Sequence, residues 1–129
     1  MNEERTFVVA DDSESMRNLL ARILSGPSVR IVAAKDGREA LEAGLALLPD
    51  LIILDQAMPR LGGVGAVKAL REDERTRDIP VLLITGGADE EGGGRAADDW
   101  LAKPFELTEF LARVDRLVAL GRRRRAAAV

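Results

Sequence analysis

Short apolar runs alternate along this chain with longer stretches in which apolar residues recur every three or four positions. A short apolar run bounded by polar residues is typical of a strand, whereas the wider spacing is typical of an amphipathic helix. The pattern therefore predicts strands that alternate with helices. The predicted strands lie near residues 6–10, 29–33, 51–54, 80–84 and 100–102, and the predicted helices near 14–24, 37–47, 64–73 and 106–120.

The order of these elements indicates the fold class. Strands that alternate with helices form βαβ units, whose strands run parallel in one sheet. The runs Leu51–Leu54 and Val81–Ile84 are apolar at every position, as in strands that are buried on both faces. A chain of 129 residues has the size of one domain. We therefore predict a single α/β domain with a parallel sheet and helices on both of its faces.

Two segments depart from the pattern. Residues 86–94 contain five glycines, which disfavours a stable helix and predicts a loop, with at most one helical turn around Arg95–Asp98. The last helix is expected to end at Gly121, because glycine is common directly after helix ends. Residues 1–121 would then form the domain, and the basic and alanine-rich residues 122–129 a tail that is disordered or continues the helix.

The composition excludes several chemistries. The chain has no Cys and no His, so disulfides, thiolate nucleophiles and histidine ligands are absent. Its 19 basic and 22 acidic residues leave a net charge of −3, which gives no reason to expect direct nucleic-acid binding. No apolar stretch is long enough to span a membrane, and the polar start MNEERT is unlike a signal peptide, so we expect a cytoplasmic protein.

Polar residues that suit one kind of chemistry follow four of the predicted strands. These are Asp11 and Asp12, Asp55, Thr85 and Lys103. If the strands are parallel, all five residues lie at the carboxyl edge of the sheet, where open α/β sheets bind ligands. The carboxylates suit Mg²⁺ (or Mn²⁺), Asp55 is placed to act as a nucleophile toward phosphorus, and Lys103 and Thr85 suit phosphoryl oxygens.

Each of these residues also has an ordinary structural interpretation. Asp12 could cap the first helix, Thr85 could be a strand-end residue without a role, and Lys103 could be a solvated lysine. Trp100 could be a half-buried aromatic residue. The joint pattern is more specific than any member, and Pro104 after Lys103 is consistent with a cis peptide bond that orients the lysine.

Five stretches of the chain resemble the receiver domain of bacterial two-component response regulators. They read VVADDSESMRNLLARIL, DGREALEA, PDLIILDQAMP, IPVLLITGG and DDWLAKPFELTEFLARV, and they are distributed over residues 8–114, so the resemblance extends over nearly the whole length of the chain. The resemblance implies a flavodoxin-like, doubly wound sheet of five parallel strands in the order 2-1-3-4-5.

The resemblance also implies a role for each site residue. Asp55 would be the phosphoacceptor, and the metal would be bound by Asp11, Asp12, Asp55 and the backbone carbonyl of Ala57. Thr85 and Lys103 would contact the phosphoryl group. Thr85 and Trp100 would form the switch, with Trp100 at a position where the family usually has Tyr or Phe. The phosphoryl donor would be a sensor histidine kinase or a histidine phosphotransfer protein.

One departure from the family pattern concerns the fourth helix. Thr85 and Lys103 are 18 positions apart, about one helical turn fewer than is usual in the family. The deficit falls in the glycine-rich segment, so the fourth helix is expected to be reduced or replaced by a loop. The spacing Pro80…Thr85-Gly86-Gly87 is similar to an atypical subgroup of receivers with a poorly ordered fourth helix.

The expected function is that of a stand-alone receiver that catalyses only its own phosphorylation and dephosphorylation, and is not otherwise an enzyme. Its phosphorylation would switch a surface read by another, unidentified protein, without direct nucleic-acid or membrane contact. Two alternatives stay open. One is a pseudo-receiver that binds a partner without phosphorylation. The other is an aspartyl-phosphate phosphatase similar to the haloacid dehalogenase family, although Ala57 stands where such enzymes need a second Asp.

Overall fold

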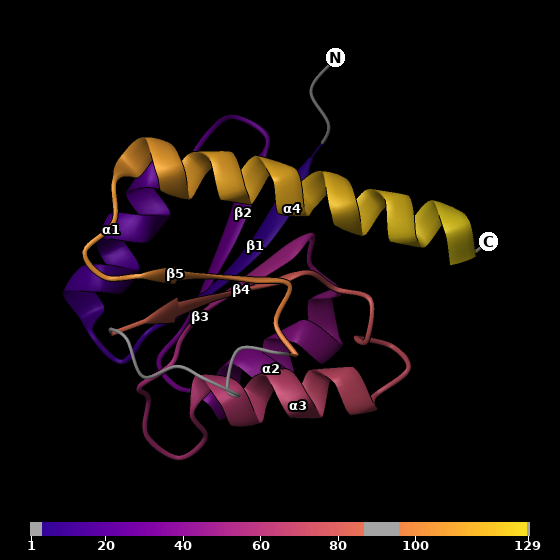
Figure 1. The fold of residues 1–129 in the computed structure, drawn as a ribbon, viewed down its shortest axis with the longest axis horizontal. Coiled ribbons are helices and arrows are strands. Elements are labelled where there is room, and N and C mark those ends of the chain that lie inside the picture. Colours follow the sequence, from indigo (N-terminus) through magenta and orange to yellow (C-terminus); the bar gives the residue numbers. More distant parts are fainter. Residues whose placement is uncertain (1–3, 87–95, 129) are drawn as a thin grey trace.

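The structure, a computed structural model, describes residues 4–86 and 96–128. Within these ranges the predicted alternation of strands and helices is confirmed (Figure 1). The strands are β1 (Arg5–Ala10), β2 (Val29–Ala34), β3 (Leu51–Asp55), β4 (Val81–Thr85) and β5 (Asp99–Ala102). The helices are α1 (Glu14–Leu24), α2 (Gly37–Leu47), α3 (Gly63–Glu72) and α4 (Leu107–Ala128).

The five strands form one parallel sheet in the order β2-β1-β3-β4-β5, as the resemblance implied. Backbone pairing places Ala10 opposite Leu54 and Thr85 opposite Ala102. Neighbouring strands therefore end at nearly the same level. The residues at and after the strand ends are therefore brought to one edge of the sheet. The predicted site required this arrangement.

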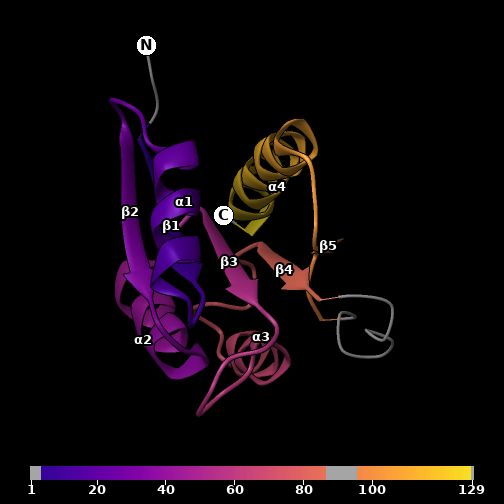
Figure 2. The ribbon, with the colours of Figure 1, turned by 90° about the vertical axis from the view of Figure 1, so that its left-hand side faces the viewer.

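Alternating side chains on the strands pack into two cores, one on each face of the sheet, because successive residues of a strand point to opposite faces. Phe7 and Val9 of β1 belong to the core under α1 and α4, whereas Val8 and Ala10 belong to the core under α2 and α3. Figure 2 shows the two helix pairs on opposite sides of the sheet. The continuously apolar strands β3 and β4 contribute to both cores, which explains their composition.

Helix α4 runs to Ala128 and so passes the position where its end was predicted (Figure 1). Gly121 is buried, and a Cβ atom added there would lie 2.7 Å from Cγ and 2.8 Å from Cδ of Pro80. The glycine thus permits close packing against the residue before β4 instead of ending the helix. Beyond it the chain is rich in Arg and Ala, which favour helix, and Arg125 pairs with Asp50 at 3.2 Å.

The expected loop in the glycine-rich segment falls mainly on residues 87–95, which lie outside the described part of the chain. Residues 96–98 form a turn and bends and lead directly into β5. Among the helices in the described ranges, none combines the length and the apolar character that crossing a bilayer requires.

The packing of Gly121 predicts the effect of Gly121→Ala. Alanine favours a helix interior by about 1 kcal/mol, but forcing a methyl group against the Pro80 ring costs about 1–3 kcal/mol. We expect a net loss of about 1 kcal/mol in the free energy of unfolding, measured by urea denaturation. Gly86→Ala is the matched control, because a Cβ atom there meets nothing within 4 Å. A gain of stability in Gly121→Ala would show that the close contact between position 121 and Pro80 is absent.

Candidate functional site

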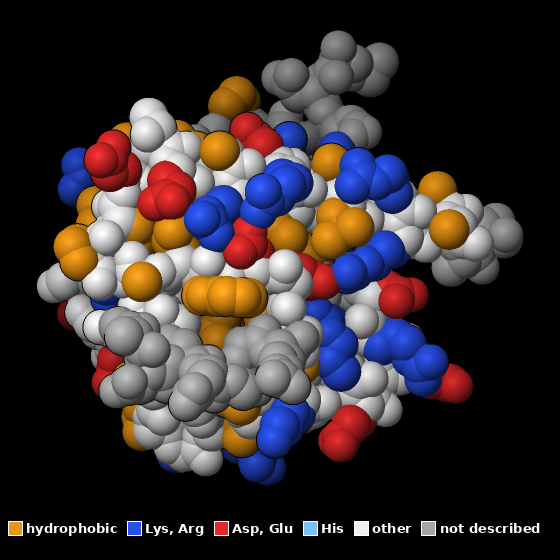
Figure 3. All heavy atoms as spheres, in the orientation of Figure 1, with side chains coloured by type: hydrophobic (Ala, Val, Ile, Leu, Met, Phe, Trp, Pro, Cys, Tyr) orange, Lys and Arg blue, Asp and Glu red, His pale blue; other side chains and the backbone are white. Residues whose placement is uncertain are grey.

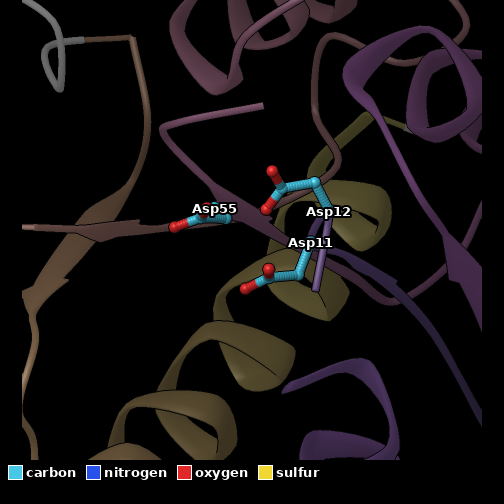
Figure 4. A group of neighbouring side chains, drawn as sticks. All are labelled: Asp11, Asp12 and Asp55. Carbon is cyan, nitrogen blue, oxygen red and sulfur yellow. The ribbon is translucent and has the colours of Figure 1, made fainter. Parts of the chain in front are cut away.

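The residues predicted from the strand ends come together at the carboxyl edge of the sheet. Asp11 and Asp12 directly follow β1, Asp55 and Thr85 are the last residues of β3 and β4, and Lys103 directly follows β5. One carboxylate oxygen from each aspartate lies within 4.8 Å of the other two. Figure 4 shows the three carboxylates gathered beside the end of β3.

The three aspartates differ in exposure. Asp11 and Asp55 are buried, with 3% and 6% of their surface exposed, whereas Asp12 is exposed. The backbone N–H of Ser13 donates to Oδ1 of Asp11 at 2.9 Å. The Ser13 hydroxyl accepts from the backbone N–H of Met16 and so caps α1. The capping role that Asp12 could have had therefore belongs to Ser13, and the Asp12 carboxylate faces the cluster.

Lys103 supplies the positive charge beside these carboxylates. Its Nζ atom lies 3.2 Å from Oδ1 of Asp55 and 3.8 Å from Oδ2 of Asp11. Its backbone N–H donates to the carbonyl of Thr85 at 2.8 Å, so the loop after β5 is joined to the end of β4. The peptide bond between Lys103 and Pro104 is cis, as the sequence suggested.

Burial raises the pKa of the Asp55 carboxyl, the Asp11 charge raises it further, and the Lys103 ammonium opposes both effects. One ammonium group cannot neutralise three neighbouring carboxylates, so the cluster favours a bound cation. The donor set is made only of oxygen atoms, which is the set that Mg²⁺ prefers over nitrogen or sulfur. The residues present therefore fit a hard divalent cation.

Thr85 places an unsatisfied hydroxyl at the same edge. Its side chain is completely buried, and within residues 4–86 and 96–128 no atom pairs with Oγ1. A buried hydroxyl without a partner is unusual, because it has lost its hydrogen bonds to water without replacement. Oγ1 therefore has an unused hydrogen bond, which the simple strand-end interpretation of Thr85 does not explain.

Trp100 lies on β5, where it pairs with Leu83 of β4. Its side chain is 54% exposed, so it is not the half-buried aromatic residue of the ordinary interpretation. The guanidinium of Arg113 donates to the Trp100 carbonyl at 2.8 Å and to the Asp99 carboxylate at the same distance. Figure 3 views this face, where exposed hydrophobic side chains lie among charged ones. Ala57, two residues after Asp55, is also exposed.

Two charged residues that were not among the predicted site residues lie beside Asp12 of the cluster. Asp36 and Arg60 line a cavity of about 380 Å³ together with Asp12, Lys35 and Pro59. A signal was present, because Asp36 follows the end of β2 by two residues and so obeys the same strand-end rule as the aspartates. Arg60 carried no such signal, since its place depends on how the loop after β3 folds back.

The model of the response regulator receiver domain family matches residues 7–115. The chain therefore belongs to this family, and the resemblance seen in its motifs is confirmed. Receiver domains are phosphoacceptors in two-component signalling that receive phosphate from histidine kinases and bind Mg²⁺ at an acidic pocket.

The relatives of the chain include proteins of different kinds, among them a transcriptional regulator and a histidine kinase. It is 37% identical over 116 residues to the DNA-binding dual master transcriptional regulator RpaA of Synechocystis, a match that covers 87% of this chain and 48% of RpaA. It is 38% identical over 117 residues to hybrid signal transduction histidine kinase D of Dictyostelium discoideum, which covers 88% of this chain and 8% of that kinase. The chain thus spans about half or less of these relatives.

The structure is also similar to solved receivers. Chemotaxis protein CheY4 of Vibrio cholerae superposes with a TM-score of 0.80 at 31% sequence identity, over 89% of this chain and 99% of that one. The flavodoxin-like receiver fold is therefore confirmed, whereas the named relatives leave the output of this chain open.

The acidic cluster predicts how stability responds to metal. Asp12→Asn removes one of three repelling charges, so the metal-free protein should gain about 1 kcal/mol in its free energy of unfolding. The same change should abolish the rise of about 1.4 kcal/mol that wild type shows with Mg²⁺ at ten times its dissociation constant. Urea denaturation with and without Mg²⁺ measures both effects. Glu74→Gln, an equal charge change at an exposed residue after α3, should change neither.

Proposed function

We propose that Asp55 accepts a phosphoryl group from a phosphohistidine on a sensor histidine kinase or a histidine phosphotransfer protein. The observation that carries this proposal is the meeting of the three carboxylates with the Lys103 ammonium, which lies 3.2 Å from Asp55. Asp11, Asp12, Asp55 and the Ala57 carbonyl would hold Mg²⁺ or Mn²⁺.

In the transfer, a carboxylate oxygen of Asp55 attacks phosphorus as the bond from phosphorus to the imidazole nitrogen breaks. When the other ring nitrogen of the phosphohistidine carries a proton, the nitrogen that leaves phosphorus keeps the electron pair and the imidazole departs as the neutral base, so no proton transfer by the receiver is needed. When bound, the metal would supply positive charge toward the phosphoryl oxygens. Lys103 adds a second positive charge, and positioning with charge neutralisation carries the catalysis. Positioning and charge neutralisation need no general base, so the site can act without His or Cys. The catalysis is limited to the phosphorylation and dephosphorylation of the chain itself.

Thr85 then reports the phosphorylated state. Its buried hydroxyl has no partner in the described part of the chain and would donate to a phosphoryl oxygen. A loop arrangement in which this bond forms is favoured only when the phosphoryl group is present, so phosphorylation shifts the population of conformations. Trp100, exposed on β5, would change its surroundings with that shift and present a different surface to a partner protein.

Phosphorylation at Asp55 predicts a mass change. After incubation with acetyl phosphate and Mg²⁺, the intact mass of wild type should increase by one phosphoryl group, and chelation of Mg²⁺ should abolish the increase. Asp55→Asn should gain nothing, while Asp78→Asn, which changes an exposed aspartate, should behave as wild type. If wild type binds Mg²⁺ but gains no mass, the non-phosphorylated binding module becomes the better interpretation.

The unpaired hydroxyl predicts that Thr85→Val separates signalling from stability. Because no hydrogen bond is lost, the free energy of unfolding should rise by about 1 kcal/mol. The Trp100 fluorescence change on adding Mg²⁺ and beryllofluoride, a phosphoryl mimic, should disappear.

Thr76→Val is the matched control for this variant. The buried Thr76 hydroxyl donates to the Leu70 carbonyl at 2.7 Å, so the control should lose about 1 kcal/mol of stability and keep the fluorescence response. Equal behaviour of the two variants would contradict the role of Thr85.

A further inference from the structure

The loop between β3 and α3, which carries Ala57, is tied to the turn before α2 by an ion pair. The guanidinium of Arg60 donates to Oδ2 of Asp36 through Nε at 2.8 Å and also through Nη2. Asp36 is buried, with 2% of its surface exposed, and its Oδ1 accepts from the backbone N–H of Glu39 at 2.8 Å. One carboxylate therefore caps α2 and anchors the neighbouring loop.

Backbone hydrogen bonds hold the same loop at two further points. The N–H of Gly37 donates to the Leu61 carbonyl at 2.9 Å, and the N–H of Gly63 donates to the Gln56 carbonyl at 3.1 Å. A Cβ atom at Gly37 would lie 2.0 Å from the Leu61 oxygen, so the two turns meet as closely as glycine allows. The ion pair is the side-chain part of this junction.

The backbone conformation at Arg60 depends on such an anchor. Its φ angle is 66°, which places a residue with a Cβ atom in the left-handed region that normally favours glycine. A non-glycine residue stays in such a conformation only when its surroundings hold it there. The hydrogen bonds from the Arg60 guanidinium to Asp36 can hold the residue in this conformation. The pKa of Asp36 lies below its ordinary value, because of the Glu39 N–H and then the Arg60 guanidinium, so the anchor is charged at neutral pH.

We propose that Arg60, anchored on Asp36, is a positioning residue for the metal site. The pair holds the loop of residues 56–62 in the arrangement that offers the Ala57 carbonyl to the cation. This inference rests on the proposed function, because it assumes that the aspartate cluster binds a divalent metal. Neither Asp36 nor Arg60 is itself a ligand in this proposal.

The positive charge of Arg60 by itself predicts the opposite change in metal affinity. The sign of the change in affinity therefore tests the proposal. Arg60 is a cation near a cation site, so its charge alone weakens metal binding and its removal would tighten binding. If Arg60 positions the loop, its removal weakens binding instead. Residues that orient metal ligands from outside typically contribute about 10-fold or more in affinity.

Mn²⁺ binding by the full chain, measured from the electron paramagnetic resonance signal of free Mn²⁺, tests the proposal. Arg60→Ala and Asp36→Asn should each raise the Mn²⁺ dissociation constant about 10-fold. Asn is a good helix cap, so the second variant keeps α2 intact and guards against an unfolded Arg60→Ala. Thermal unfolding should show that both variants are folded at the temperature of the measurement.

Two further variants complete the experiment. Lys35→Ala removes a cation that lines the same cavity but that takes no part in the junction, so it should not weaken Mn²⁺ binding. Asp12→Asn should weaken binding strongly if the aspartate cluster is the metal site. Tighter or unchanged binding by Arg60→Ala, with Asp12→Asn still impaired, would overturn the positioning role alone. No Mn²⁺ binding by wild type would overturn the proposed function as well.

Discussion

The site depends on the repulsion between carboxylates that lie side by side at the carboxyl edge of a buried sheet. The parallel pairing of β1 with β3 forces Asp11 and Asp55 together where water is largely excluded, and the pKa of Asp55 rises for that reason. The backbone holds Asp11 and Asp55 together, because the last four residues of β1 and all of β3 are buried between two layers of helices. The repulsion is therefore stored in the rigid part of the fold, and a cation or the Lys103 ammonium relieves it.

The rest of the site follows from this charge distribution. Lys103 offsets part of it directly, and its backbone bond to the Thr85 carbonyl joins β5 to the end of β4. A phosphoryl group at Asp55 would bring new acceptors to the same place. The Lys103 ammonium is a donor beside Asp55, and the Thr85 hydroxyl, at the end of the neighbouring strand, is a donor without a partner among the described residues. Trp100 is exposed on β5.

The opposite edge of the sheet is held by ion pairs instead of being left with uncompensated charge. Asp98, just before β5, accepts from Arg71 of α3 at 2.8 Å, from Arg124 of α4 and from the Val81 N–H. Arg71 also donates to three backbone carbonyls, those of Ala96, Arg77 and Ile79. These contacts join the amino edge of β4 and β5 to α3 and to the end of α4.

Patterns along the chain were enough to predict the strands, the helices, the two faces of the core and the five polar residues at the carboxyl edge of the sheet. The strands and helices depend on hydrophobic periodicity, which is a local property of the chain, and the parallel direction of the strands follows from their alternation with helices. The contacts made by Gly121 and Arg60, in contrast, could be found only in the folded chain. Glycine after a helical pattern looks like a helix end, but at Gly121 it allows contact with Pro80, which lies 41 positions earlier. Arg60 looks like a solvated loop residue, and only the return of its loop to Asp36 gives it a buried partner. Contacts between residues distant in sequence leave no periodic signal, so the fold alone revealed them.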